Sequence, residues 1–423
     1  MSSESSSPAF GHAMRSYFGF DSDYINLNHG AFGAVPKPVV EAAHALTNRV
    51  ESNPDYFMRL EYELLLDEGR ARLAQLVGAD VDECVLVPNV SNGINTVLRN
   101  FEWAEGDILV SASTTFDSIA RAVENITGAR PQVPHPGVSK FILDFPQSHA
   151  TILASFREHL RAVKSQAPNN TIVALIDTIV SQPAILMPWK QMVKICKEEG
   201  VWSVIDGAHS LGQELNIGLS EADPDFWVGS CSKWMYTKRG CTLLYVPKRN
   251  QHIIKTTLPT AHSVLAASED KPPTAFVMEF IYFGTVEAIP FLSIKAALDF
   301  RDSIGGEETI NAYCHSLAKA GGRRLAEVMG TSMMVTDNED ELIANMVNVE
   351  LPFPATIAST KAVFRVFQNR LLQDHKMYAG HFFHNGKWWT RACAQIYNEI
   401  GDFEKLGYAL VAICNEIKEA EAR

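Results

Sequence analysis

The chain has 423 residues, of which 46% are hydrophobic and 20% are charged, a composition typical of a globular protein with two or three domains. Its net charge of −12 argues against a nucleic-acid partner, since nucleic-acid affinity rests largely on phosphate neutralisation by Lys and Arg. Seven scattered cysteines, an odd number without a CxxC pair, predict reduced thiols in a cytoplasmic protein and no metal site.

The N-terminal segment MSSESSSPAF has neither the charged start nor the apolar centre of a signal peptide, so residues 1–9 are predicted to be a disordered polar tail. No apolar run approaches the length of about 18 residues that a membrane span needs, and no membrane partner is expected. Residues 24–38 (YINLNHGAFGAVPKP) form a loop broken by Gly and Pro, followed by a helical pattern from Val39 to about Arg49. A second helix is predicted from Leu60 to Val77, with Gly78 as its stop.

Strands and helices then alternate along the chain. Strands are predicted for the apolar runs CVLVPN, DILVSAS, TIVALID, VWSVID, DFWVGS and GCTLLYV. Helices are predicted for SNGINTVLRN, SIARAVENI and PWKQMVKICKEEG, the last ending at Gly200. Continuous apolar strands that alternate with helices are typical of a mostly parallel sheet covered by helices, so the predicted fold class is α/β.

The C-terminal part predicts a smaller α+β domain. A helical region begins at 295–304, and the strand-like segments MVNVELP and KWWTRACAQIYN flank a helix predicted at 365–378. The chain is therefore divided into an N-terminal tail, loop and helix (1–50), a large α/β domain (51–294) and a small C-terminal α+β domain (295–423).

Two groups of polar residues follow strands of the predicted sheet, where open α/β sheets bind ligands. In PNVSNGINTVL a strand ends at about Asn89 and the segment from Ser91 to Gly93 opens a helix, whose free N–H groups could bind an anion or simply be capped by Ser or Asn. In VIDGAHSLG, Asp206 follows a strand directly and His209 lies three residues further on. The Asp206 carboxylate could face a cationic ring nitrogen or could cap the next helix.

A third candidate is Lys233, in the segment CSKWM after the apolar run DFWVG. A lysine in apolar surroundings loses some of its preference for charge, and a neutral amine can form a Schiff base, although most lysines extend to the surface. An anion-binding helix start, an Asp at a strand end and a Lys after the next strand are together the parts of a pyridoxal 5′-phosphate site. The bound ring would then serve as an electron sink for a carbanion at the substrate Cα.

Six segments together resemble the class V branch of the fold-type I pyridoxal phosphate enzymes, which includes isopenicillin N epimerase-like proteins, cysteine desulfurases and kynureninases. The segments are LNHGAFGAVP (27–36), VPNVSNGINTVL, VIDGAHSLG, GSCSKW, FGTVE (283–287) and WTRACAQIYNEIGDFEKL. The resemblance covers nearly the whole chain. It implies a seven-stranded type of large sheet and a homodimer with shared active sites, because the Gly-Thr turn of this family reaches the phosphate of the partner subunit.

The resemblance implies roles for individual residues. Lys233 would bind the cofactor as a Schiff base, Asp206 would pair with its ring nitrogen, and His209 would lie near its phenolic oxygen. Arg391 would bind the substrate α-carboxylate with its guanidinium fork, unless it is an ordinary surface arginine. His29 would line the substrate pocket, unless it is only a turn residue. The further implied cofactor contacts are Ser91, Asn92, Gly93, Ser230, Ser232, Gly284 and Thr285, and the further candidates for the substrate pocket are Asn28, Tyr56, Arg59, Asp177 and His381.

Two positions depart from the family pattern. Many relatives carry His directly before the lysine, whereas this chain has Ser232, which can still donate to phosphate. Phe116 stands where an aromatic ring should stack over the cofactor as a catalytic residue. A Tyr there could also protonate a leaving group, which Phe cannot do, so either stacking suffices or this chain has lost an acid.

Within the branch, the chain most resembles fungal C–S lyases of ergothioneine biosynthesis, through the loop at 24–38 and the segments TTFDSIARAV and SNPDYFMR. This resemblance implies β-elimination from an amino-acid substrate, the S-oxide of a cysteine conjugate of trimethylated histidine, with Lys233 taking the Cα proton and pyruvate and ammonia as products. The alternatives are a kynureninase, a cysteine desulfurase, an epimerase, an aminotransferase, or a non-catalytic protein that binds the cofactor. A desulfurase needs a mobile catalytic cysteine, and the place of Cys393 in a predicted strand counts against it.

Overall fold

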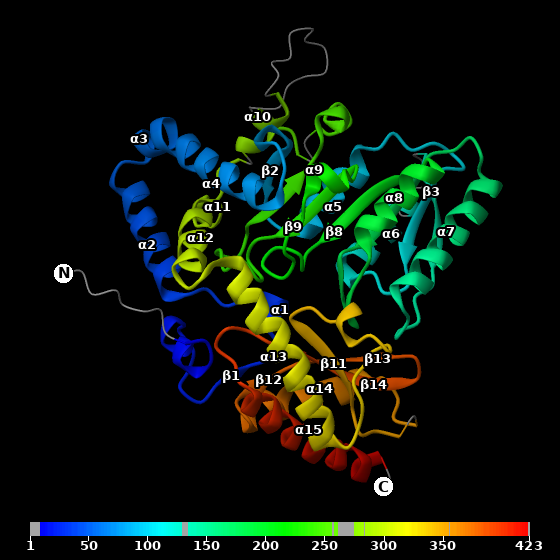
Figure 1. The fold of residues 1–423 in the computed structure, drawn as a ribbon. Coiled ribbons are helices and arrows are strands. Elements are labelled where there is room, and N and C mark those ends of the chain that lie inside the picture. Colours follow the sequence, from blue (N-terminus) through cyan, green and yellow to red (C-terminus); the bar gives the residue numbers. More distant parts are fainter. Residues whose placement is uncertain are drawn as a thin grey trace.

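The computed structural model describes residues 9–128, 134–255, 258–260, 275–282, 284–354 and 356–421, so the predicted disordered tail lies outside the described residues except for its last position. Figure 1 shows a larger body built on a twisted sheet and a smaller body below it, with α13 (Gly306–Met329) running from their junction down the smaller body. The predicted division at residues 50 and 294 stays a prediction.

A seven-stranded sheet of order β2-β10-β9-β8-β5-β3-β4 forms the centre of the larger body. Strand β10 is antiparallel to both of its neighbours, and the pairs from β9 to β4 are parallel, which gives a mostly parallel α/β sheet. The strands are β2 (Cys84–Val87), β3 (Ile108–Ala112), β4 (Gly137–Phe141), β5 (Ile172–Asp177), β8 (Trp202–Gly207), β9 (Phe226–Ser230) and β10 (Thr242–Tyr245). Apolar runs predicted every strand except β4. This edge strand, GVSKF, keeps most of its side chains in solvent and so lacks an apolar run.

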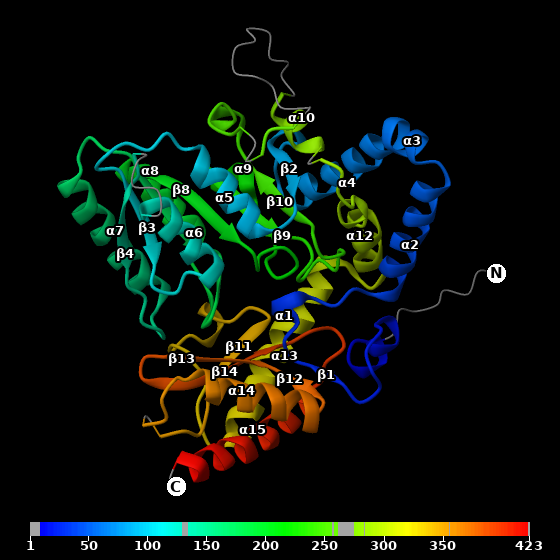
Figure 2. The ribbon, with the colours of Figure 1, turned by 180° about the vertical axis from the view of Figure 1, so that it is seen from behind.

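Helices cover the sheet, as Figures 1 and 2 show from opposite sides. They include α5 (Val90–Asn100), α6 (Asp117–Gly128), α7 (His149–Gln166) and α8 (Trp189–Glu199). Gly93 lets α5 lie close to β9, because a Cβ at this position would stand 2.5 Å from Cγ1 of Val228. The close packing fixes the N-terminus of α5 over the carboxyl ends of the strands.

The N-terminal region forms α1 (His29–Phe32), α2 (Lys37–Ser52), α3 (Pro54–Tyr56), a π-helical turn (Phe57–Glu61) and α4 (Tyr62–Val77). The helix predicted from Leu60 begins two residues later because the π-helical turn precedes it, and it ends as predicted at Gly78, which has φ +66°. In both views α1 lies at the junction between the two bodies (Figures 1 and 2).

The smaller body contains a three-stranded antiparallel sheet of β11 (Met346–Glu350), β14 (Lys387–Cys393) and β13 (Gly380–His384). Helices α13 and α15 (Ile400–Glu421) pack on each other, and α13 also packs on β11 and β14 of this sheet. The prediction of a helix at 365–378 is wrong in its bounds. Helix α14 spans Lys361–Asn369 with Thr360 as its cap, and a π-helical turn ends at Asp374. Residues 377–378 form β12, which pairs with β1 (Ile25–Asn26), a contact that local periodicity does not report.

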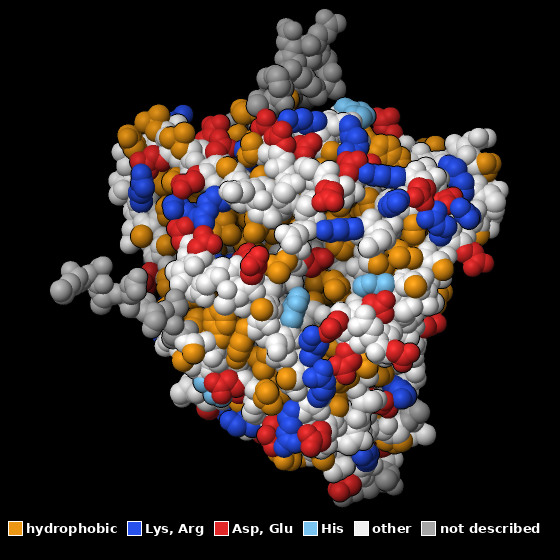
Figure 3. Space-filling model, in the orientation of Figure 1, with side chains coloured by type: hydrophobic (Ala, Val, Ile, Leu, Met, Phe, Trp, Pro, Cys, Tyr) orange, Lys and Arg blue, Asp and Glu red, His pale blue; other side chains and the backbone are white. Residues whose placement is uncertain are grey.

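The remaining elements are short or connect the two bodies. They are β6 (Ile179–Ser181), β7 (Ala184–Leu186), α9 (Leu219–Ala222), α10 (Ala275–Ile281), α11 (Ile289–Leu292), α12 (Ile294–Ser303) and the 3-10 helices at 12–17, 81–83, 248–250 and 339–341. None of the helices in the described ranges is long and apolar enough to cross a bilayer. Basic and acidic side chains are interspersed over the face seen in Figure 3, so this face carries no continuous basic field.

Candidate active site

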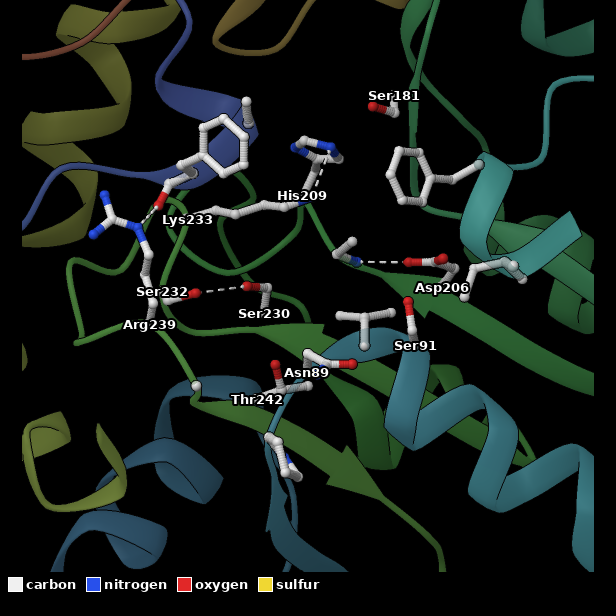
Figure 4. A pocket seen from close by; sticks show the side chains of 18 of the residues that line it. Asn89, Ser91, Ser181, Asp206, His209, Ser230, Ser232, Lys233, Arg239 and Thr242 are labelled. Atoms are coloured by element: carbon white, nitrogen blue, oxygen red, sulfur yellow. Dashed lines mark hydrogen bonds between the residues drawn. The ribbon is translucent and has the colours of Figure 1, made fainter. Parts of the chain in front are cut away.

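A cavity of about 300 Å³ opens at the carboxyl ends of the parallel strands. Strands β5, β8 and β9 each end at its wall, and the start of α5 forms one side of it. Figure 4 shows Lys233 extending across this cavity. Of the residues predicted for the site, those that line it are Ser91, Phe116, Asp177, Asp206, His209, Ser230, Ser232 and Lys233.

The start of α5 is capped by Asn89, whose Oδ1 accepts a hydrogen bond of 2.8 Å from the backbone N–H of Asn92. An asparagine therefore caps the helix, as one of the two alternatives for this segment had it, and the capping residue is Asn89. Asn92 does not line the cavity, whereas the Ser91 hydroxyl does. The cap had a clear sequence signal, because Asn89 is the last polar residue before the helical pattern.

Hydroxyl groups gather beside this helix start. Ser230 Oγ and Ser232 Oγ lie 3.4 Å apart, and Thr242, which the sequence reasoning missed, completes the wall. In Figure 4, Asn89, Ser91 and Thr242 lie on the same side of Lys233 as the two serines. Hydroxyl donors next to free helix N–H groups suit a phosphate group.

Two carboxylates lie side by side at the carboxyl ends of two central strands, since Asp177 of β5 and Asp206 of β8 are register partners. Asp206 Oδ1 accepts a 2.9 Å hydrogen bond from the backbone N–H of Ala208, which closes a turn, so Asp206 caps no helix. Burial raises the pKa of Asp206, and the bond from Ala208 and the Lys233 charge oppose that rise. Burial and the neighbouring Asp206 charge raise the pKa of Asp177 well above its usual value.

The pKa of Lys233 is set by desolvation of its amine and by the charges of neighbouring side chains. Burial lowers its pKa from 10.5 to about 8, although the Asp206 carboxylate raises the value, and Arg391 lowers it further. Its Nζ lies 3.2 Å from Nε2 of His209. A lysine with a pKa near 8 offers a substantial neutral fraction near neutral pH, as a nucleophile or base requires.

Arg391, on β14, is buried next to the cavity. Its Nη1 donates to the Ser181 carbonyl and hydroxyl at 2.9 and 3.1 Å, and its Nη2 donates to Asn28 Oδ1 at 2.8 Å. Ser181 lines the cavity, on the opposite side of Lys233 from the hydroxyl group cluster in Figure 4. Sequence reasoning missed Ser181, whose one signal is its place shortly after strand β5.

Aromatic rings and a guanidinium stand at the mouth. Phe116, at the start of α6, is 48% exposed, and Phe32, at the end of α1, is 73% exposed. Arg239 donates through Nε to the Phe32 carbonyl at 3.0 Å and through Nη2 to the Gly33 carbonyl at 2.9 Å. Phe32 and Arg239 were not predicted, because a loop sequence does not show which side chains a cavity will face.

Several predicted residues lie away from the cavity. His29 is fully buried, and its Nε2 lies 2.8 Å from the Lys233 carbonyl oxygen, so it supports the lysine from behind instead of lining the pocket. His381 is buried against Phe367, with ring centroids 4.4 Å apart. The other predicted residues outside the wall of this cavity are Asn28 and Arg391, which bond to each other, Asn92 and Gly93 of α5, the exposed Tyr56, Arg59 and Thr285, and the half-buried Gly284.

The donor set fits pyridoxal 5′-phosphate. Ser91, Ser230 and Thr242 suit the phosphate, and a carboxylate with one oxygen already bonded to backbone suits a protonated ring nitrogen. The desolvated amine of Lys233 extends across the cavity beside these groups, where the cofactor aldehyde would bind. No group of three or more His, Cys, Asp or Glu side chains suited to a metal occurs among the described residues.

Comparison with known proteins gives matches along nearly the whole chain. The model of the family "Aminotransferase class-V" matches residues 25–356. The L-cysteine desulfhydrase-like protein lolT1 of Epichloe uncinata is 33% identical over 97% of both chains. Hercynylcysteine sulfoxide lyase of Schizosaccharomyces pombe is 29% identical over 96% of this chain and 98% of its own.

Solved structures share the fold at low identity. The apo cysteine desulfurase of Thermococcus onnurineus superposes with a TM-score of 0.72 at 18% identity, covering 97% of this chain and 100% of its own. The cystine C–S lyase C-DES, in complex with cysteine persulfide, has a TM-score of 0.74 at 18% identity and covers 92% of this chain and 98% of its own. The similarity extends over both bodies of the chain.

Proposed function

Because this chain belongs to the aminotransferase class-V family and is a pyridoxal 5′-phosphate-dependent carbon–sulfur lyase, we propose that it catalyses β-elimination from a cysteine S-conjugate. The proposed substrate is hercynylcysteine sulfoxide, the S-oxide of the cysteine conjugate of trimethylated histidine. The observation that carries the reaction type is the desolvated amine of Lys233 in the cavity, on which the charges of Asp206 and Arg391 both act.

Three residues of the chain have separate roles in the proposed reaction. Arg391, held by Ser181 and Asn28, binds the substrate α-carboxylate. Lys233 takes the proton from the substrate Cα. Asp206 holds a proton at the cofactor ring nitrogen, and the bound cofactor supplies an electron sink for the charge left on Cα.

The bond between Cβ and sulfur then breaks, and the sulfur leaves with the electron pair. Hydrolysis of the three-carbon fragment gives pyruvate and ammonia. From an S-oxide the sulfur fragment leaves as a sulfenic acid, and two-electron reduction by a thiol gives ergothioneine. The side chain at position 116 of the cavity wall is Phe116, which has no hydroxyl and cannot donate a proton to the sulfur. This favours a substrate whose sulfur leaves without an acid at that position, as an S-oxide allows.

The mouth of the cavity supports a cationic substrate. Phe32 and Phe116 present exposed aromatic rings there. A quaternary ammonium group is attracted to the faces of such rings, by about 0.5–1 kcal/mol at an exposed site. The trimethylammonium group of the proposed substrate matches this surface.

A second candidate substrate is L-cysteine, with sulfide in place of the sulfenic acid. Relatives that carry the name L-cysteine desulfhydrase favour it, such as the protein of Arabidopsis thaliana, 26% identical over 92% of this chain. A desulfurase is less well supported, since Cys393 is fully buried in β14 and its Sγ lies 3.5 Å from the backbone N–H of Gly30.

We also propose a cytoplasmic homodimer. Thr285 is exposed, and neither Gly284 nor Thr285 lines the cavity of its own chain, as expected if this turn serves the phosphate of the partner subunit. The seven cysteines are all buried and free, which suits a reducing compartment. No substrate contact is assigned to Tyr56, Arg59 or His381, which lie outside the cavity wall. Light scattering of the purified holoenzyme measures the oligomer.

One experiment tests the function. The holoenzyme is incubated with L-cysteine, several cysteine S-conjugates and their S-oxides, and pyruvate, alanine and sulfide are measured. Pyruvate formation that is fastest with hercynylcysteine sulfoxide supports the proposal. Sulfide with pyruvate from L-cysteine alone would favour the second candidate, and alanine would indicate a desulfurase. Lys233→Ala protein should release no pyruvate, and full activity in this variant would refute the mechanism.

A further inference from the structure

Three side chains form a hydrogen-bonded series that ends at the lysine. The indole Nε1 of Trp234 lies 3.2 Å from Nδ1 of His209. The other ring nitrogen of His209, Nε2, lies 3.2 Å from Nζ of Lys233. Trp234 and His209 are both buried, and Figure 4 shows the His209 ring directly beside Lys233.

The direction of each hydrogen bond follows from its donors. An indole N–H can only donate, so Nδ1 of His209 must accept. Burial lowers the pKa of His209 well below its ordinary value, and the charges of Lys233 and Arg391 lower it further, so the ring is neutral. A neutral imidazole that accepts at Nδ1 carries its hydrogen on Nε2. That N–H points at Lys233 Nζ, which can accept it only through the lone pair of a neutral amine.

We propose that Trp234 is a positioning residue for Lys233: by donating to Nδ1 it holds His209 in the tautomer that donates toward Nζ and thereby favours the neutral, nucleophilic amine. The inference rests on the proposed role of Lys233 and adds the residue that sets its reactivity. A tryptophan that only filled space would need no particular direction of its N–H. Here the direction decides which form of the lysine is stabilised.

Trp234 is held independently of His209. Its carbonyl accepts a 2.8 Å hydrogen bond from Nη1 of Arg301, and Arg301 is paired with Glu307. On the other side, a Cβ at Gly30 would stand 3.0 Å from the indole ring, so the N-terminal loop packs directly on it. The indole N–H is therefore fixed in place before any ligand arrives.

Other charges also act on Lys233. Asp206 of β8, Asp177 of β5 and Cys393 of β14 raise its pKa, and Arg391 of β14 lowers it. The donor on His209 acts in the same direction as burial and Arg391, and opposes the carboxylates. Loss of the hydrogen bond from His209 Nε2–H should therefore raise the pH at which the Lys233 amine becomes neutral. A single hydrogen bond of ordinary strength corresponds to a shift of about one pH unit.

The test measures how fast the full chain without cofactor captures pyridoxal 5′-phosphate as a function of pH. The captured group is fixed with borohydride and located by mass spectrometry. The capture rate rises with the neutral fraction of Lys233, so its midpoint reports the lysine. In Trp234→Phe, which keeps an aromatic ring but no donor, the midpoint should rise by about one unit. The matched control is Trp388→Phe, which removes the indole donor to the Ile357 carbonyl and should leave the midpoint unchanged.

Variants of His209 separate positioning from packing. His209→Gln can still accept from Trp234 and donate toward Lys233, so its midpoint should stay near that of the wild type. His209→Ala should raise the midpoint, and adding Trp234→Phe to it should cause no further change. In protein with ¹⁵N-labelled histidine, the NMR shifts of the His209 nitrogens should report hydrogen on Nε2, and this preference should be lost in Trp234→Phe.

The outcomes distinguish the inference from the proposed function. An unchanged midpoint in Trp234→Phe, with the label still on Lys233, would overturn the inference and leave the lysine mechanism intact. Capture that persists in Lys233→Ala would refute the lysine mechanism itself. If Trp234→Phe does not fold, equal midpoints for His209→Ala and His209→Gln would overturn the inference, and a rise in the alanine variant alone would support it.

Discussion

Replacing Arg391 with lysine tests how the substrate carboxylate is bound. The guanidinium is fixed by donated hydrogen bonds of 2.9 and 3.1 Å to Ser181 and of 2.8 Å to Asn28. These bonds leave a planar fork whose orientation is set before the substrate binds. A lysine keeps the charge but offers a point donor on a shorter and more flexible chain, so it cannot reproduce the fork.

The expected magnitude follows from the hydrogen bonds lost. One charge-assisted hydrogen bond to the carboxylate corresponds to about 1.5–3 kcal/mol, or about 10- to 100-fold in affinity. We expect Arg391→Lys to raise KM by about that factor, with kcat changed much less, because the carboxylate is bound equally in the ground and transition states. Steady-state pyruvate release measures both constants. The matched control is Arg121→Lys in α6, because the exposed Arg121 forms an ion pair with Glu124 and does not line the cavity.

An inhibitor series adds an internal check. The inhibition constant of an S-conjugated amine that lacks the α-carboxylate should be the same in wild-type and Arg391→Lys protein. The reasoning fails if KM changes less than about twofold, or if the amine loses affinity to the same degree as the amino acid.

Three further predictions concern single side chains. Phe116→Tyr adds a proton donor at the mouth and should raise turnover of thioether substrates about tenfold or more but not that of S-oxides; no change with either would mean that only the ring matters. Phe32→Ala should raise KM about two- to fivefold for trimethylammonium substrates and not for neutral conjugates; an equal rise for both would exclude a cation–π contact. Burial lowers the pKa of His381 from 6.5 to about 3, so the unfolded chain binds a proton there that the folded chain does not, and stability falls as pH drops from about 6.5 toward 3. At pH 5 this group alone lowers the free energy of unfolding by about 2 kcal/mol. Urea unfolding should therefore show that His381→Phe loses less stability than the wild type between neutral pH and pH 5. An equal loss of stability in the two proteins would contradict the role of His381.

The sequence predicts those parts of the fold that local pattern determines. Central strands read as apolar runs because both of their faces are buried. Asp206 was expected just after its strand and lies within the last residues of β8, and Lys233 lies three residues after the end of β9. Edge strand β4 has no such run. The helix predicted at 365–378 fails because Met377 and Tyr378 pair with β1, more than three hundred residues earlier in the chain.

The site could be predicted as a set of residue types but not as a set of contacts. Arg391 meets Asn28 and Ser181 from distant parts of the chain, and no spacing in the sequence reports that meeting. For the same reason His29 was expected at the substrate, whereas it bonds to the backbone of Lys233. Burial decides between such roles, and a loop sequence rich in Gly and Pro carries little information about burial.

The N-terminal segment, residues 24–38, was expected as a loop but contains β1 and α1, and it contacts both the backbone at Lys233 and the proposed carboxylate site. A carbonyl only accepts, so His29 donates through Nε2 to the Lys233 carbonyl, and its Nδ1 accepts from the Tyr397 hydroxyl at 2.8 Å. Gly33 has φ +66°, and a Cβ there would stand 2.2 Å from the Ser232 carbonyl oxygen. The segment therefore contacts the backbone carbonyls of both Ser232 and Lys233. The same segment supplies Asn28 to Arg391 and Phe32 to the cavity mouth. A change in the length of this segment would therefore move the carboxylate site and the lysine together, so altered substrate choice is better sought at Phe32, whose side chain faces solvent.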